Sequence, residues 1–260
     1  MQDLSAGLVD DAIAVLAALR TRAPRVQCLT NTVAQQITAN VLLAAGARVS
    51  MATHPAEVVD MTASADAVLF NLGTIDAARI DAIPRLLADA RVLALPRVLD
   101  PVFVEHSPLR LALATRIVAA GPLIVKGNAG ELAALLLPPS ATRVETGATD
   151  RIATGTSTIE IRNGHAWMAE VTGLGCALGG LIAACAAVET DAVVAATSAV
   201  LAFGVCGEVA ARTSAGPGTF AANFIDAIAG LNAATLRSHA RLGMEHLEAG
   251  NDGLHRTQQT

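Results

Sequence analysis

The chain has 260 residues, a net charge of −5 and an isoelectric point near 5.6, and no basic run occurs in it. That balance excludes a protein that binds nucleic acid through a positively charged surface. Apolar residues make up 53% of the chain and aromatic residues only 2%, so we expect a large core of small aliphatic side chains. No linker or repeat divides the sequence, which predicts one domain over residues 1–260 with a short tail after about residue 245.

The sequence shows no targeting or membrane signal. Its N-terminus carries Asp3, Asp10 and Asp11 and lacks the basic and apolar segments of a signal peptide. The four cysteines have no CxxC spacing, which is typical of a reduced cytoplasmic protein. Two uncharged stretches, Val171–Val188 and Ala192–Gly207, are at or below the shortest length that spans a bilayer, so we interpret them as buried helices and expect no membrane association.

In the first half of the chain, short apolar runs alternate with helical runs. This alternation predicts a parallel sheet with helical crossovers, and so an α/β fold. The predicted strands are Val26–Leu29, Arg48–Met51, Ala67–Asn71, Val92–Leu99 and Leu123–Val125. The predicted helices are Thr38–Ala45, Ala56–Ser64, Ala77–Ala90 and Pro108–Ala120.

The second half has a different pattern. Ala141–Glu145, Ser157–Arg162 and Ala166–Val171 are predicted to form shorter, partly antiparallel strands, with Asn163-Gly164 as a hairpin turn. From Cys176 onward we expect helices.

Polar residues follow several of the predicted parallel strands. Ligands bind beyond the carboxyl ends of the strands in open parallel sheets, so these residues predict a binding site there, although each alone also suits a turn or a cap. They are Thr30-Asn31, Asn71, Asp100 and Lys126-Gly127-Asn128.

The Thr172-Gly173-Leu174-Gly175-Cys176 turn opens onto an apolar helix. Glycines allow close backbone approach, and the free N–H groups and dipole of a helix N-terminus hold an anion, although a plain tight turn has the same composition. Cys176 lies at this N-terminus, where a thiol is more easily ionised.

Two acidic residues, together with the anion-binding turn, suggest the hypothesis that the chain transfers a phosphoryl group. Asp100 and Glu131 are suited to hold a hydrated Mg²⁺ opposite the glycine turn, and Lys126 to contact a polyphosphate. The alternatives are a cap or turn role for each acid and a solvated lysine.

In these motifs the chain resembles the hydroxyethylthiazole kinase family. The resemblance runs from about residue 25 to 231 and implies a ribokinase-like three-layer sandwich with a mostly parallel central sheet and helices on both faces. It implies phosphorylation of the primary alcohol of 4-methyl-5-(2-hydroxyethyl)thiazole in thiamine salvage, with ATP as co-substrate, Mg²⁺ as cofactor and a homotrimeric assembly. The matching segments are CLTNTVAQQITANVLLAAGA, SMATHPAEV, ADAVLFNLGT, VLDPV, KGNAGELAAL, VTGLGCALGG, AFGVCGEVAAR and GPGTF.

The resemblance also implies roles on the side of the thiazole. Met51 matches the methionine that contacts the ring, Asn31 lines the same pocket, and Gly173 contacts the substrate through its backbone. Cys176 falls where related sugar kinases carry an aspartate base, which places it near the attacking hydroxyl.

On the nucleotide side, Lys126 and Thr146 match residues that contact ATP, and Asp100 and Glu131 match the acids near magnesium and phosphate. Lys126 stands where the family usually has arginine.

Two further departures from the family pattern concern the nucleotide. The segment Phe103–Ser107 replaces a glycine-rich loop, and only Leu132–Arg143 connects the NAGE motif to the next strand, where relatives have a longer helical stretch. These changes predict weaker ATP binding. They leave open a kinase for another small alcohol, such as a pyrimidine, and a non-catalytic thiazole-binding homologue.

Overall fold

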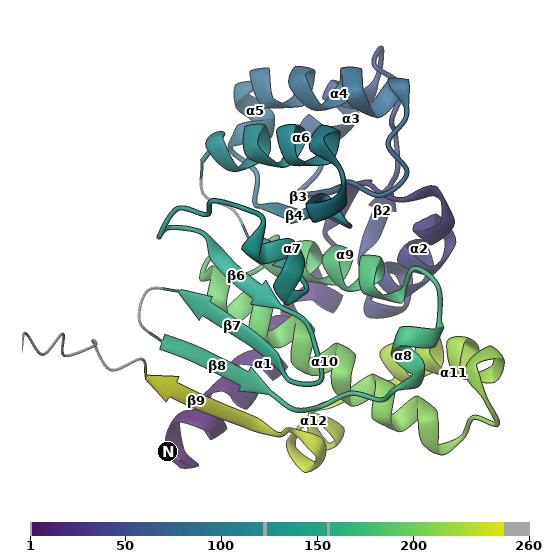
Figure 1. The fold of residues 1–260 in the computed structure, drawn as a ribbon. Helices are drawn as coiled ribbons and strands as arrows, with labels where there is room; N and C mark the ends of the chain where they lie inside the picture. Colours follow the sequence, from purple (N-terminus) through teal and green to yellow (C-terminus); the bar gives the residue numbers. More distant parts are fainter. Residues whose placement is uncertain (1, 122–123, 155–156, 247–260) are drawn as a thin grey trace, which may run out of the picture.

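The computed structural model describes residues 2–121, 124–154 and 157–246. Nine strands of these residues form one sheet in the order β2-β1-β3-β4-β5-β6-β7-β8-β9 (Figure 1). Strands β1 to β6 pair in parallel, and β6 to β9 pair antiparallel. The strands are β1 (Arg25–Leu29), β2 (Arg48–Ser50), β3 (Ala67–Asn71), β4 (Arg97–Asp100), β5 (Ile124–Gly127), β6 (Thr142–Glu145), β7 (Asp150–Thr154), β8 (Ser157–Ile161) and β9 (Leu242–His246).

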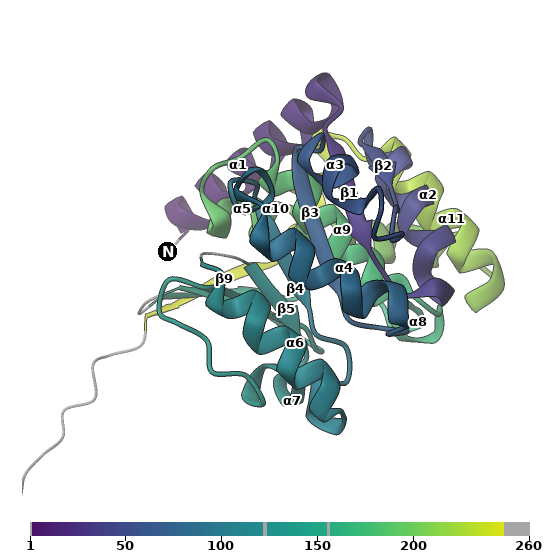
Figure 2. The same ribbon diagram turned by 90° about the horizontal axis from the view of Figure 1, so that it is seen from above.

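Helices cover both faces of the parallel part of the sheet, as the sequence predicts (Figures 1 and 2). One face packs against α1 (Gln2–Arg22), α2 (Gln35–Ala45), α9 (Leu174–Ala186), α10 (Ala192–Arg212), α11 (Pro217–Gly230) and α12 (Ala233–His239). The other face packs against α3 (Val58–Ala63), α4 (Ala77–Ala88), α5 (Ala90–Leu93), α6 (Pro108–Ala119) and α7 (Ala129–Ala133).

Alternate residues of each parallel strand enter two separate cores. Leu69 of β3 and Val98 of β4 belong to the core under α9 and α10, while their neighbours Phe70 and Leu99 belong to the core under α4 and α6. This alternation is the two-residue period of a strand, and burial on both faces explains why these strands are continuously apolar.

The two uncharged stretches form buried helices. Of the described helices, α10 alone is long and apolar enough to cross a membrane, and most of its residues are buried in the core. Its partner α9 packs closely on α2, because a side chain at Gly180 would lie 3.1 Å from Thr38.

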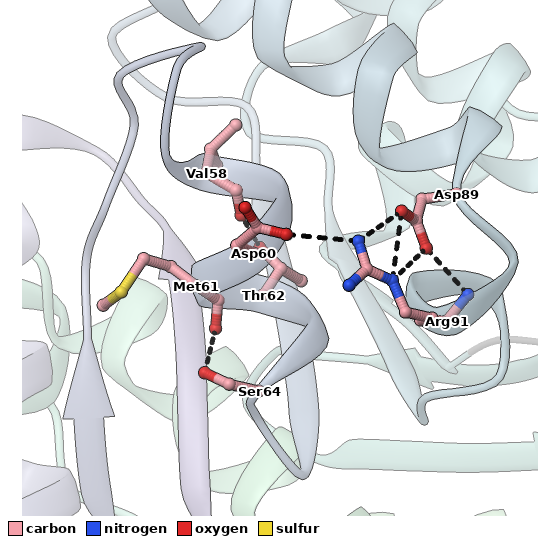
Figure 3. A network of polar contacts seen from close by, with 7 residues as sticks. All are labelled: Val58, Asp60, Met61, Thr62, Ser64, Asp89 and Arg91. Atoms are coloured by element: carbon pink, nitrogen blue, oxygen red, sulfur yellow. Dashed lines mark hydrogen bonds and ion pairs between the residues drawn. The ribbon is translucent and has the colours of Figure 1, made fainter.

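Polar contacts join α3 to the segment that precedes β4 (Figure 3). Arg91 donates to Asp89 at 2.8 Å and to Asp60 at 3.3 Å, and Asp89 accepts the backbone N–H of Arg91. Hydrogen bonds from Arg91 lower the pKa of Asp89 to about 2. Asp89 is thus the N-cap of α5, which corrects the predicted strand Val92–Leu99: the strand is β4 and begins only at Arg97.

The second half differs from the sequence prediction in two elements. Residues of Ala166–Val171 form a short helix, α8 (Trp167–Glu170), and Asn163-Gly164 is not a hairpin turn because β8 ends at Ile161 and pairs with β9 instead. Apolar residues in a short run do not distinguish a strand from a helical turn, and here Met168 packs against Gly207 of α10.

Three further elements were not predicted. These are α1, β7 and β9, and β9 shows that the chain after Cys176 is not purely helical. The outer face of β7 and β8 is charged, with Arg151 bound to Glu160 at 3.0 Å, as suits an antiparallel extension with one solvated face. Of the predicted strand Leu123–Val125, Leu123 lies outside the described residues, and so do residues 247–260 of the predicted tail.

Candidate active site

The carboxyl ends of the parallel strands bring the predicted polar residues together. In the sheet register Asn71 of β3 lies beside Asp100 of β4, and Gly127 of β5 lies beside Glu145 of β6. Thr146 follows directly, and its N–H donates to the carbonyl of Gly127 at 2.9 Å. The structure therefore brings these predicted residues together at one edge of the sheet.

Asp100 and Lys126 form a buried ion pair at the centre of this group. The Lys126 Nζ lies 3.2 Å from Asp100 Oδ2, and the two residues are 6% and 1% exposed. Burial opposes the lysine charge, yet the facing Asp100 carboxylate keeps the pKa of Lys126 above its ordinary value. Burial raises the pKa of Asp100, and the ammonium group of Lys126 opposes that rise. Lys126 therefore stays protonated and carries a positive charge, and it is the only lysine of the chain.

Glu131 is held by backbone groups on both carboxylate oxygens. Asn128 is the N-cap of α7, and the two side chains form a capping box, with Asn128 N–H donating to Glu131 Oε2 at 2.9 Å. The N–H of Phe103 donates to Oε1 at 2.8 Å. Glu131 therefore helps to cap α7, as one of the two interpretations of the sequence expects. The same contacts hold its carboxylate near Asp100.

The glycine turn starts α9 in the conformation that the sequence predicts. Gly173 has φ +84°, and a Cβ there would lie 2.8 Å from the Cα of Ala34, so glycine is required. The N–H of Leu174 donates to Val171, whereas within the described residues no acceptor takes the N–H groups of Gly175 and Cys176. Two backbone donors at this N-terminus are therefore available to an anion.

Cys176 faces the same group of side chains, but it is not a thiolate. Burial raises the pKa of its thiol to about 11, and the carboxylate of Asp100 adds to the rise, against the opposing charge of Lys126. This corrects the prediction that the helix N-terminus makes the thiol more easily ionised. The burial and the neighbouring carboxylate outweigh the helix dipole, and neither is visible in the sequence.

A cavity of about 590 Å³ opens from this edge of the sheet. Lys126, Thr146 and Gly175 line one part of it, together with Asp150. Apolar side chains also line the cavity, namely Leu174, Leu178, Val200, Phe203 and Met168. The cavity thus combines polar and charged groups beside the N-terminus of α9 with an apolar surface that suits a flat ring.

The three residues expected to contact the thiazole lie outside this cavity. Asn31 follows β1, and its side chain caps the 3-10 helix Thr32–Ala34 by accepting the N–H of Val33 at 3.2 Å. Gly173 packs on Ala34 of that helix, so Asn31 and Gly173 belong to neighbouring segments. Met51 follows β2 at the edge of the sheet and is partly buried against the core.

The loop after β4 shows backbone strain at two residues that are not glycine. Val102 and Phe103 have φ values of +34° and +55°, in the left-handed region that favours glycine. Arg110 holds the Val102 carbonyl at 2.5 Å, Glu131 holds the Phe103 N–H, and the Phe103 side chain is 59% exposed. The chain thus keeps a glycine-like conformation with bulkier residues.

Asp150 is a candidate site residue that the sequence did not indicate. Its Oδ1 accepts the N–H of Gly147 at 2.9 Å in the turn between β6 and β7. Burial raises the pKa of this carboxyl to about 6, against the opposing N–H of Gly147 and the charge of Lys126. Because β7 was not predicted, the only signal was an aspartate three residues after a Thr-Gly pair, which is too common to single out.

Comparisons with known proteins identify the family of the chain. The sequence model of the hydroxyethylthiazole kinase family matches residues 16–138 and 139–234. The two segments meet between Pro138 and Pro139, where the sequence predicts a shortened connection. A probable hydroxyethylthiazole kinase of Agrobacterium fabrum is 42% identical over 231 residues, which are 89% of this chain and 94% of the relative.

Solved structures show the same fold. The structure of a hydroxyethylthiazole kinase protein from Pyrococcus horikoshii OT3 matches with a TM-score of 0.86 and 33% identity, over 90% of this chain and 99% of that one. A ribokinase-like superfamily protein of Enterococcus faecalis V583 matches with a TM-score of 0.60 and 15% identity, over 80% of this chain and 88% of that one, which supports the fold alone.

The fold is therefore ribokinase-like, and the relatives that match most of the chain define its class as a kinase. Within that class the chain belongs to the hydroxyethylthiazole kinase family.

Proposed function

We propose that this chain transfers the γ-phosphoryl group of ATP to the hydroxyl of 4-methyl-5-(2-hydroxyethyl)thiazole in thiamine salvage. One observation carries the proposal: Lys126, which is paired with Asp100, and Gly175, with its unbonded N–H, line the same cavity, and a Cβ at Gly175 would lie 3.8 Å from Lys126 Nζ. Fixed positive charge and backbone donors on one wall are what a moving phosphoryl group requires, because catalysis of this transfer is mostly positioning and charge stabilisation.

ATP would occupy the cavity with its phosphates toward Lys126 and its base toward the apolar side chains. Thr146 and Lys126 are the proposed ATP contacts, and both line the cavity. In the free protein Lys126 is paired with Asp100, so a bound phosphate would compete for its ammonium group.

The thiazole would bind beside Asn31, Met51 and Gly173, with its hydroxyl toward Cys176. With a pKa of about 11 the Cys176 thiol is neutral at physiological pH, so its role would be to hydrogen-bond the attacking hydroxyl rather than to act as a thiolate base. A loose phosphoryl-transfer transition state needs little deprotonation of the hydroxyl, which makes a neutral group sufficient.

Asp100 and Glu131 are the residues proposed for Mg²⁺, although no cluster of three or more metal-ligating side chains occurs in the described part of the chain. A site of two carboxylates fits a hydrated Mg²⁺, because that ion keeps several waters and uses one or two protein carboxylates. Lys126 and Asn71 both bind Oδ2 of Asp100, which leaves Oδ1 for a metal-bound water. When bound, Mg²⁺ would neutralise charge on the phosphates.

We further propose a single domain, a homotrimer, a cytoplasmic location and no binding of nucleic acid or membranes. The negative net charge supports the absence of nucleic-acid binding. The burial of α9 and α10 in the core supports the absence of membrane binding and, with it, the cytoplasmic location.

Phe103 and the short α7 support the alternative of a thiazole-binding homologue with a weakened ATP site. A lysine such as Lys126 makes no bidentate contact to phosphate, and the lack of such a contact lowers the affinity for ATP by about one to two decades.

Isothermal titration calorimetry with hydroxyethylthiazole and with Mg-ATP distinguishes the kinase from the thiazole-binding homologue. The proposal expects both to bind, with ATP weaker than in longer relatives. Thiazole binding without any ATP binding would favour the homologue, and ATP binding without thiazole binding would favour a kinase for another alcohol.

A further inference from the structure

Asn71, at the carboxyl end of β3, is a buried amide that connects four parts of the site. It is 1% exposed. Its Oδ1 accepts the N–H of Gly73 at 3.0 Å and the N–H of Asn31 at 3.3 Å. Its Nδ2 donates to Asp100 Oδ2 at 2.9 Å, and its side chain lowers the pKa of the Cys176 thiol against the larger effect of burial.

These contacts fix the direction of the amide. Both lone pairs of Oδ1 are directed at backbone N–H groups, so the NH₂ group must face Asp100. The reverse orientation would place NH₂ hydrogens against two N–H donors and Oδ1 against a carboxylate. Donation into Oδ1 also polarises the amide, which strengthens its own donation to Asp100.

The same contacts fix the carboxylate. Asn71 and Lys126 converge on Oδ2 of Asp100, one from β3 and one from β5. Two donors on one oxygen define the rotation of the carboxylate and turn Oδ1 away from both. Lys126 alone is insufficient if its ammonium group moves to a phosphate, so Asn71 is the donor that stays with Asp100 while a nucleotide is bound.

We propose that Asn71 is a positioning residue that holds Asp100 in one orientation during phosphoryl transfer and ties it to the Asn31 segment on the thiazole side. This role rests on the proposed kinase function. It requires that loss of the Nδ2 donor lowers kcat much more than it raises the KM for hydroxyethylthiazole, because the affected carboxylate acts on the transferring group and not on ring binding.

The test compares the steady-state kinetics of Asn71→Asp and Asn71→Ala with those of the wild type. Asn71→Asp keeps the volume and both acceptor contacts but sets a second carboxylate against Asp100, whereas Asn71→Ala removes the donors without adding charge. Asn223→Ala is the control, because the Asn223 side chain, like that of Asn71, makes three hydrogen bonds, but it binds Thr213 and Ser214 away from the cavity. We expect kcat to fall about 10- to 100-fold in both Asn71 variants, the KM for the thiazole to change less than about threefold, and the control to keep its kcat.

Folded Asn71 variants with a wild-type kcat would overturn the role, and so would a change confined to KM. If neither variant folds while Asn223→Ala does, Asn71 is a structural residue and the inference is wrong. An inactive wild type would instead overturn the proposed function itself, so the two failures are distinguishable.

Discussion

Oδ2 of Asp100 lies 3.2 Å from Nζ of Lys126, and neither side chain has appreciable contact with solvent. A buried pair of this kind is stabilised by mutual attraction only while both partners are present. Lys126 reaches the carboxylate as a point charge, where an arginine would offer a fork of donors. The structure therefore places the central charge of the site next to an acid that competes with phosphate for it.

We predict that Cys176 reacts slowly with thiol reagents in the native protein. At a pKa of about 11, roughly one thiol in 3,000 is ionised at pH 7.5, and the other three cysteines are buried with pKa values of about 12. Alkylation by iodoacetamide, followed by intact-mass spectrometry, should be far slower in buffer than in urea. Rapid, selective modification of Cys176 would contradict the raised pKa.

Cys176→Ala should lower kcat about tenfold with little change in folding stability, and Cys176→Ser should restore most of the rate, because a neutral donor is what the site supplies. Kinetics and thermal unfolding of the two variants measure this. Equal rates in the wild type and Cys176→Ala would reduce the thiol to a packing residue.

Glu131→Gln should affect both metal dependence and stability. A glutamine keeps one acceptor oxygen but places an NH₂ group against a backbone donor, which costs about 1–2 kcal/mol of unfolding free energy. We also expect the Mg²⁺ concentration for half-maximal rate to rise severalfold, as measured by titrating Mg²⁺ at fixed ATP. Asn128→Ala is the control, since it removes the reciprocal cap bond and leaves the carboxylate. If both variants lose stability and neither changes the Mg²⁺ concentration for half-maximal rate, Glu131 is only a helix cap.

Phe103→Gly should be more stable than Phe103→Ala. At φ +55° any Cβ is strained by about 1 kcal/mol or more, whereas glycine is not, so the usual order of the two residues is reversed. The control is Leu136, an exposed leucine that is not among the described residues with positive φ, where the alanine variant should be the more stable. Urea unfolding of the four variants gives both differences, and a more stable alanine at position 103 would contradict the strained loop. Phe103→Gly should also lower the KM for ATP.

Asp150 predicts a specific dependence of stability on pH. Its pKa is about 6 in the folded protein against an ordinary 3.8, so between pH 4 and 6 the folded state binds more protons than the unfolded state. The contribution of this carboxyl to the free energy of unfolding is therefore complete below pH 4 and is lost as the pH rises to 6. The loss is about 2 kcal/mol, because the carboxyl is partly exposed and solvent weakens the effect.

Asp150→Asn removes this loss and keeps the acceptor for the N–H of Gly147. The variant should be more stable than the wild type at pH 7.5 and equal to it near pH 4, as measured by urea unfolding. The exposed Asp226→Asn serves as the control. Equal stability of Asp150→Asn and the wild type at pH 7.5 would show that Asp150 is not desolvated.

The sequence alone predicts where a residue lies when its position along a strand or helix determines its location in the fold. Asn71, Asp100 and Lys126 come together because each ends a parallel strand, and strand ends are visible as polar residues after apolar runs. The glycine at position 173 was likewise readable, since only glycine permits that turn.

What the sequence did not reveal depends on distant contacts. The pKa of Cys176 follows from burial under neighbouring elements and from Asp100, which is 76 residues away in the chain. Asp150 entered the site through β7, whose short mixed sequence lacks a clear strand pattern. The start of β4 was misplaced because Asp89 caps a helical turn within an apolar run that also suits a strand.

Product formation from hydroxyethylthiazole tests the central claim most directly. The purified chain is incubated with Mg-ATP and either hydroxyethylthiazole or a hydroxymethylpyrimidine, and the phosphorylated alcohols are measured by mass spectrometry, with Lys126→Met as the variant that lacks the central positive charge. We expect thiazole monophosphate in an amount equal to the ADP formed, little pyrimidine phosphate, and a loss of rate of at least about 100-fold in Lys126→Met. Phosphorylation of the pyrimidine but not of the thiazole, or a Lys126→Met variant that folds and keeps the wild-type rate, would contradict the central claim.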